Sequence, residues 1–116
     1  MREVIRDRER LEHIITAIDY ALEFSEGVSR ETLGEDKMRY YAIVKNIENI
    51  GEASYMLSGD FKSRHAEIEW AAVEGMRHFL VHEYYQVSDG KLWNVLKYDL
   101  LPLRHQIESY LSETCV

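Results

Sequence analysis

The sequence has little cysteine, proline or glycine, and these shortages restrict the structures that it can form. Its one cysteine, Cys115, cannot form an intramolecular disulfide, so the fold needs no oxidising compartment. One proline and six glycines in 116 residues leave no low-complexity linker. We therefore expect a single domain over residues 1–116, stabilised by a hydrophobic core.

Long hydrophobic runs and an excess of positive charge are also missing. No segment approaches the roughly 20 apolar residues that span a bilayer, and no signal-peptide pattern follows the N-terminus, so we expect a cytoplasmic protein without membrane segments. The 14 basic and 21 acidic residues give a net charge of −7. This balance weighs against broad binding to nucleic acid, DNA included, but still allows a small basic cleft.

Hydrophobic residues recur at helical spacing through most of the chain, and no stretch alternates as a strand would. The first predicted helix covers residues 3–25 and ends near Gly27, a plausible C-cap. The second begins after Asp36, a candidate N-cap, and ends at Ser58-Gly59. Within it, Gly51 suggests that another helix approaches closely.

The second half of the chain predicts a short helical turn over residues 60–65 and two further helices. One begins near Ile68 and continues into the stretch 77–85, and the residues 87–90 break it. The last carries apolar residues from Leu92 to Leu111, with a kink expected near Tyr98 to Pro102. The resulting fold is an all-α, antiparallel up-and-down bundle of four main helices plus the connecting turn.

The stretch from Arg77 to Tyr85 concentrates the chemistry of the chain: arginine binds phosphate, histidine transfers protons near neutral pH, and tyrosine offers a hydroxyl. In a continuous helix Arg77 and His82 lie roughly 140° apart, so they do not share one stripe. A site that uses both therefore needs an unwound helix, a cleft that wraps around it, or a second subunit.

Purely structural interpretations of this stretch stay open. Arg77 could pair with Glu74 or Glu83, and His82 could be a hydrogen-bonded residue at a helix end. Tyr84 and Tyr85 could simply pack there. The hydrophobic neighbours are expected in the core or a subunit interface: Trp70, Met76, Phe79 and Leu80.

A metal site is a further alternative for this stretch. His78 and His82 stand four residues apart, as two zinc ligands on one helix face would. A third ligand would have to come from elsewhere, for example His65 or Glu83, and no glutamate stands between the two histidines as in zinc proteases. The remaining histidines, His13, His65 and His105, have no recognisable partner in the sequence, so we interpret them as surface or helix-face residues.

The pattern Arg77-x4-His82-x-Tyr84 resembles the signature of the HEPN superfamily, in its HepT-like toxin branch. The similarity spans residues 36–111. It includes the segment Ile50-Gly51-Glu52-Ala53, the connection 61–70 and the segment 99–102. His78 fits the residue that follows the arginine, although asparagine is more typical there. Prolines that are common in the connection are absent, and Glu83 adds an acid beside the signature.

The resemblance implies a homodimeric helical bundle in which two signatures face each other across a cleft. The implied activity is metal-independent RNA cleavage, without a cofactor, in which the ribose 2′-hydroxyl attacks the adjacent phosphate. Arg77 would bind the phosphate and His82 would act as general base or acid, with His78 in support.

The resemblance also implies a partner. HepT-like toxins pair with a nucleotidyltransferase antitoxin of the MNT type, which transfers AMP to the tyrosine of the signature, here Tyr84. A bulky, negatively charged group would then stand beside Arg77 and His82. The alternative is a non-catalytic helical dimer that binds a nucleotidyltransferase or a nucleotide, which the net charge of −7 and Glu83 would favour.

Overall fold

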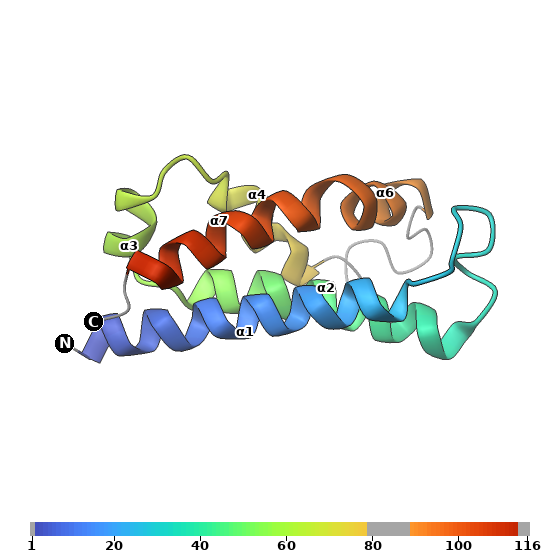
Figure 1. The fold of residues 1–116 in the computed structure, drawn as a ribbon, viewed down its shortest axis with the longest axis horizontal. Coiled ribbons are helices and arrows are strands. Elements are labelled where there is room, and N and C mark those ends of the chain that lie inside the picture. The colour runs from blue at the N-terminus through green and yellow to red at the C-terminus, as the bar shows by residue number, and fades with distance from the viewer. Residues whose placement is uncertain (1, 79–88, 114–116) are drawn as a thin grey trace.

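The computed structural model describes residues 2–78 and 89–113, and most of these lie in helices. Helices α1 (Arg2–Phe24) and α2 (Lys37–Met56) run antiparallel and side by side (Figure 1). The expected first and second helices are confirmed nearly residue for residue. Gly27 follows α1 at a φ of 78°, the left-handed conformation that ends many helices, and the Asp36 side chain caps α2 by accepting from the Arg39 amide.

The short turn that the sequence predicts after α2 is helix α3 (Gly59–Arg64). Ser58 caps it by accepting from the Phe61 amide at 3.1 Å. The same serine donates through its amide and its hydroxyl to the buried carboxylate of Asp7, at 2.8 and 2.7 Å. A polar contact between α1 and the α2–α3 junction therefore fixes the start of the connection.

The expected third helix is shorter and less regular than its periodicity suggests. Helix α4 (Trp70–Gly75) gives way to η1 (Met76–His78), a turn of tighter 3₁₀ geometry. The prediction of one regular helix from Ile68 into the stretch 77–85 is therefore wrong at Met76, already before Arg77. Residues 79–88 lie outside the described residues, and they include the first half of the break expected at residues 87–90.

The last predicted helix consists of α6 (Asp89–Asn94), η2 (Val95–Asp99) and α7 (Leu100–Glu113). Segment η2 is a π-helix, in which the Leu100 amide donates to the Val95 carbonyl, five residues back. The irregularity that the sequence predicts near Pro102 is thus a π-helical segment just before it. Proline cannot donate to the carbonyl four residues back, and a local change of hydrogen-bond register accommodates that loss.

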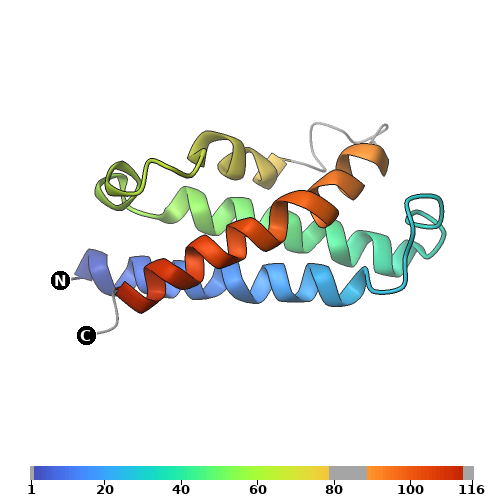
Figure 2. The same cartoon turned by 45° about the horizontal axis from the view of Figure 1, so that its top comes forward.

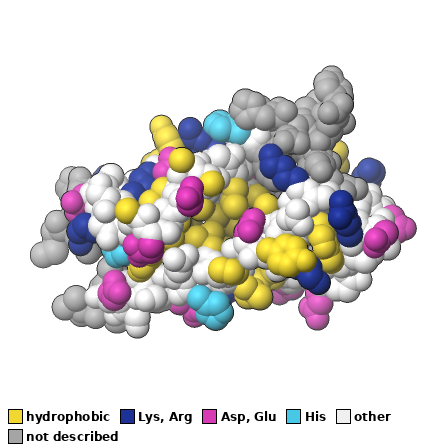
Figure 3. All heavy atoms as spheres, turned by 90° about the horizontal axis from the view of Figure 1, so that it is seen from above, with side chains coloured by type: hydrophobic (Ala, Val, Ile, Leu, Met, Phe, Trp, Pro, Cys, Tyr) yellow, Lys and Arg dark blue, Asp and Glu magenta, His cyan; other side chains and the backbone are white. Residues whose placement is uncertain are grey.

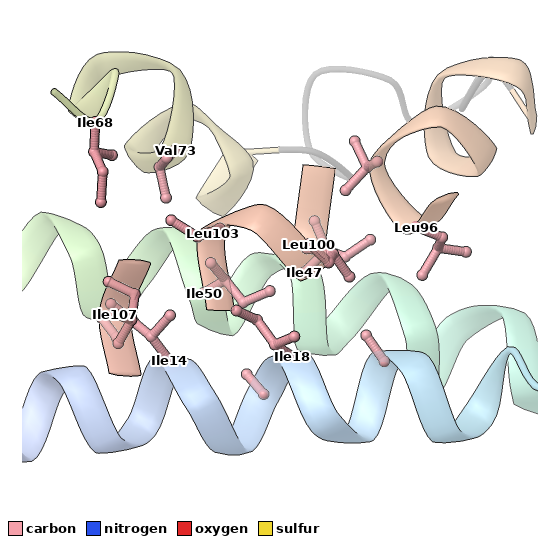
Figure 4. Close-up of a cluster of buried hydrophobic side chains, with 14 of the residues drawn as sticks. Ile14, Ile18, Ile47, Ile50, Ile68, Val73, Leu96, Leu100, Leu103 and Ile107 are labelled. Atoms are coloured by element: carbon pink, nitrogen blue, oxygen red, sulfur yellow. The ribbon is translucent and has the colours of Figure 1, made fainter. Parts of the chain in front are cut away.

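The core lies where α7 crosses the α1–α2 pair (Figure 2). Its centre is formed by aliphatic side chains from all three helices, as Figure 4 shows: Ile14, Ile18, Ile47, Ile50, Leu100, Leu103 and Ile107. Ile68 and Val73 extend it beneath α4. The apolar stripes read from the sequence face this core, because each helix buries one face only. Helix α1 begins and α7 ends at the same end of the molecule (Figure 1).

A polar and aromatic cluster ties the connection after α3 to the end of α7. His65 contacts its surroundings through both ring nitrogens: Nδ1–H donates to the Phe61 carbonyl oxygen at 2.9 Å, and Nε2 lies 3.7 Å from the Glu113 carboxylate. Its ring stacks on Phe61 and packs against Tyr110, both at 4.2 Å between centroids. The expectation that His65 has no partner is therefore wrong, whereas His13 and His105 are exposed as expected.

Within the same cluster the Tyr110 hydroxyl donates to the carboxylate of Glu67. This hydrogen bond is the main reason that the pKa of Glu67 falls below its ordinary value of 4.5. Burial, and then the bond to Glu67, raises the pKa of Tyr110 above its ordinary value of 10.0. No helix among the described residues has the length and hydrophobicity to cross a membrane.

Candidate functional site

Arg77 and His78 lie in η1, which packs against α2. Because η1 follows α4 without a break, the α4–α2 contact fixes the height of Arg77 along α2. The Arg77 side chain is half-buried, and that of His78 is exposed. Arg77 and His78 thus lie at the surface, on a backbone segment that packs against α2.

Gly51 makes the close approach of η1 to α2 possible. A Cβ atom at position 51 would overlap the Arg77 backbone nitrogen, and it would lie 2.8 Å from the Met76 carbonyl carbon and 2.9 Å from the Arg77 Cα. Real Cβ atoms essentially never come so near to backbone atoms, and here the neighbours are backbone rather than flexible side chain. The close approach expected from Gly51 is confirmed, and the segment that approaches is the one that carries Arg77.

Tyr55, one turn after Gly51 on α2, holds the other end of Arg77. The guanidinium carbon of Arg77 lies 3.7 Å from the centroid of the Tyr55 ring, within the range of a cation–π contact. Sequence reasoning missed Tyr55, which is 49% exposed and lies outside the apolar stripe of α2. Its spacing of four from Gly51 was the available signal, because residues four apart lie on one helix face.

The third contact of Arg77 is with its neighbour His78. The Arg77 Nε–H donates to His78 Nε2 at 3.0 Å. In this arrangement His78 Nε2 carries no proton, and the ring acts as a neutral acceptor. The supporting role expected of His78 is therefore compatible with its position beside the arginine, which it helps to orient.

The alternative interpretation of Arg77, an ion pair with Glu74 or Glu83, is contradicted for Glu74. Glu74 pairs with Lys62 of α3, at 2.8 Å between Nζ and the carboxylate, and not with Arg77. Among the residues that the structure describes, no carboxylate forms an ion pair with Arg77. Glu83, the other candidate, lies outside the described residues.

The remaining members of the predicted site, His82, Tyr84 and Tyr85, lie outside the described residues. So does part of the alternative metal site, which needs His82 and a third ligand such as Glu83 or His65. Over residues 2–78 and 89–113 no three histidine, cysteine or carboxylate side chains cluster as metal ligands. His65 is committed to Phe61, Tyr110 and Glu113.

Two hollows on the surface lie away from Arg77. One, of about 360 Å³, runs between α1 and α2 and is lined by Arg10, His13 and Tyr20 on one side and Asn49 and Glu52 on the other. The second, of about 380 Å³, separates α4 from α7, and Figure 3 shows hydrophobic side chains on that face. Neither is lined by Arg77 or His78, so we define the site by the side-chain contacts of these two residues.

Comparison with known proteins assigns the chain to a family. The sequence matches the family described as "Ribonuclease HepT-like" over residues 14–110. This chain belongs to the HepT-like ribonuclease family. The match covers α1 from its second half, all of α2, and almost all of α7, so the Arg77 turn and the helices that support it are both included.

Two curated relatives match over nearly their whole length. A protein of Thermococcus cleftensis, named "Probable ribonuclease HepT", is 36% identical over 87% of this chain and 92% of its own. A "Putative RNase" of Caldanaerobacter subterraneus subsp. tengcongensis is 31% identical over 91% and 95% of the two chains. The search of solved structures found no significant match. The HEPN and HepT-like resemblance read from the sequence is confirmed, and with it a ribonuclease family.

Proposed function

We propose that this protein is a metal-independent endoribonuclease, the toxin of a toxin–antitoxin pair, which acts in the cytoplasm as a homodimer with its site at the dimer cleft. Arg77 binds the scissile phosphate of RNA, and His82 acts as general base or acid, with His78 holding Arg77. The observation that supports this most directly is the environment of Arg77. Its guanidinium is held by a neutral ring and a neutral imidazole, and no described carboxylate neutralises it.

This environment suits phosphate binding for a simple reason. Stacking on Tyr55 uses the flat face of the guanidinium, whereas its N–H donors point outward in the plane. His78 takes the Nε–H, and the two terminal NH₂ groups are the pair that binds phosphate oxygens bidentately. An arginine held in this way needs no reorientation when the phosphate becomes more negative in the transition state.

The proposed reaction is an internal transfer at phosphorus. The 2′-oxygen forms a bond to the adjacent phosphorus, and the bond from phosphorus to the 5′-oxygen breaks. The 2′-hydroxyl loses its proton to a base, the 5′-oxygen gains one, and the products carry a 2′,3′-cyclic phosphate and a 5′-hydroxyl. His82 is suited to either transfer, since an imidazole changes its protonation state near neutral pH. No cofactor is needed.

Cleavage of RNA in the presence of EDTA tests this function. The native chain, Arg77→Ala and His82→Ala would be incubated with a labelled RNA, and the ends of the products would be identified. Cleavage by the native chain alone, with cyclic phosphate ends, is the expected result. Equal cleavage by all three proteins, or none by the native chain, contradicts the proposal.

Regulation is the second part of the proposal. A nucleotidyltransferase antitoxin of the MNT type transfers AMP to Tyr84, and the added phosphate charge and bulk close the site to RNA. Mass spectrometry of the co-expressed proteins should find an AMP adduct on Tyr84, absent after Tyr84→Phe. An adduct on Tyr85, or no adduct, contradicts this part without affecting the cleavage experiment.

One alternative function has an observation of its own. The net charge of −7 is unfavourable for binding RNA broadly, and it favours a non-catalytic dimer that docks a nucleotidyltransferase or binds a nucleotide. This alternative predicts a stable complex with the partner that survives Arg77→Ala, and no cleavage of RNA by the native chain.

A further inference from the structure

The geometry points to Tyr55 as the residue that positions Arg77 for catalysis: we propose that its ring holds the guanidinium in the orientation that binds phosphate. This inference rests on the proposed ribonuclease function. Tyr55 itself is not a catalytic residue in this proposal, because it acts through Arg77. Nothing in the sequence pattern of the signature includes it.

The first step is that α2 fixes Arg77 at both ends. The backbone of η1 sits directly on Gly51, and the guanidinium sits on Tyr55 one turn later. Two contacts to one rigid helix leave the long arginine side chain few orientations. An arginine supported only by its backbone would sample many rotamers at the surface.

The second step is that the support is neutral. A carboxylate at position 55 would also fix the guanidinium, but it would compete with the phosphate for the same N–H donors. An aromatic face attracts the cation through its quadrupole and uses none of those donors. Tyr55 therefore orients the charge and leaves it available, which is what a phosphate-binding arginine requires.

The third step is that Tyr55 has no competing structural role in the core. Its side chain is 49% exposed, and Tyr55 is not among the buried residues of α2: Ile43, Val44, Ile47, Ile50, Gly51, Ala53 and Ser54. A substitution at position 55 can therefore remove the ring without opening a cavity. Leucine keeps apolar bulk and a good helix propensity but has no quadrupole, and phenylalanine keeps the ring without the hydroxyl.

The first experiment measures RNA cleavage by the full-length native protein, Tyr55→Phe and Tyr55→Leu. We expect Tyr55→Phe to retain kcat within about twofold and Tyr55→Leu to lose about tenfold in kcat with little change in KM. Tyr41→Leu is the matched control, since Tyr41 is also an exposed tyrosine of α2, at 55%, and contacts Tyr40 instead. A rise in KM alone would show that Tyr55 contacts RNA, and it would overturn the positioning role.

A double-mutant cycle separates action through Arg77 from other effects. In an Arg77→Ala background, Tyr55→Leu should lower the residual cleavage rate no further, because the residue that it positions is gone. An additional tenfold loss in that background would overturn the proposal.

The second experiment does not depend on activity, so it distinguishes failure of this inference from failure of the ribonuclease function. The ring current of Tyr55 should shift the NMR signals of the Arg77 side chain upfield in the native protein and in Tyr55→Phe. Those signals should return to ordinary arginine values in Tyr55→Leu. If they are the same in all three proteins, the stacking contact does not exist in solution and the inference fails, whether or not RNA is cleaved.

Discussion

Arg77 and Arg104 are both partly exposed arginines on the same scaffold, and they differ in what holds them. Arg104 of α7 donates to both carboxylate oxygens of Asp19 on α1, at 2.6 and 3.1 Å, and also pairs with Glu108 at 2.7 Å. These acids, the hydrogen bond to Asp19 first, raise its pKa above the ordinary value. Arg77 is held by the Tyr55 ring and His78, without a carboxylate among the described residues.

The difference separates a structural arginine from one that can bind a substrate. The charge of Arg104 is neutralised within the protein, and its donors are occupied, so it links α7 to α1. The Tyr55 ring and His78 orient the charge of Arg77, and no carboxylate among the described residues pairs with it, so it stays available to an anion. The two regions therefore predict opposite effects of removing each arginine on cleavage and on stability.

Replacing each arginine in turn should produce the largest contrast. Arg77→Ala should lower the rate of RNA cleavage by about 10²- to 10³-fold, as removal of a transition-state donor does elsewhere, with little change in Tm. Arg104→Ala should leave cleavage within about twofold and lower the free energy of unfolding by about 1 kcal/mol, a few degrees in Tm. Cleavage assays and thermal unfolding of both variants check this contrast.

The opposite pattern would break the comparison. If Arg104→Ala abolished cleavage in a protein that remains folded, Arg104 would belong to the site. Arg77→Lys offers a sharper version, since lysine keeps the charge but lacks the planar fork. It should retain less than about a tenth of the cleavage rate if bidentate binding matters.

The support beneath Arg77 should be the next most sensitive feature. Gly51→Ala places a methyl group where the η1 backbone now lies, so it should destabilise the protein by about 1–3 kcal/mol and displace Arg77. Gly75→Ala is the matched control, because a Cβ at this nearby position meets no atom within 4 Å. Chemical unfolding should show a loss for Gly51→Ala only. Equal stability of the two variants would show that η1 does not rest on α2.

A smaller effect should come from the acid nearest to Arg77 in the chain. Lys62 holds Glu74, three residues before Arg77, and Lys62→Met would release that carboxylate. Because residues three apart are neighbours on a helix, Glu74 could then pair with Arg77 and compete with phosphate. We expect cleavage to fall by about threefold and to recover in Lys62→Met combined with Glu74→Gln. A loss that persists in the double variant would assign Lys62 a separate role.

The bundle was largely predictable because it depends on periodicity. Each apolar stripe identifies the buried face of its helix, and caps such as Asp36 act through neighbours in the sequence. The 3₁₀ turn at Met76 and the π-helical segment at residues 95–99 were not predictable in this form. These irregular turns depend on how the helices pack against one another. The hydrophobic pattern of the sequence does not distinguish them from regular α-helix.

The candidate site divides in a similar way. The signature residue Arg77 was identified from the sequence, and Gly51 correctly indicated a close approach of helices. Tyr55 was missed because its partner is 22 residues away, and only the packing of η1 on α2 brings them together. The position of His82 stays a prediction, as do the dimer and the modification of Tyr84.

The smallest effect should come from the polar contact between Tyr110 of α7 and Glu67, which belongs to the structural region. The Tyr110 hydroxyl lowers the pKa of Glu67 below 4.5, so the contact stabilises the fold above that pH and is lost as the pH falls through the lowered pKa. The pKa of Tyr110 is raised, so its stabilisation is complete below pH 10.0 and declines as the pH rises further.

Tyr110→Phe removes the hydroxyl but keeps the ring against Phe61 and His65. Its Tm at pH 7 should be slightly lower than that of the native protein, and this difference should shrink as the pH falls toward 3 and as it rises above about 10. Cleavage at pH 7 should be unchanged, because Tyr110, like Arg104, contacts only residues outside the candidate site. A constant Tm difference across the pH range would show that the hydroxyl does not bond to Glu67. A loss of cleavage would show that the structural region and the site are coupled.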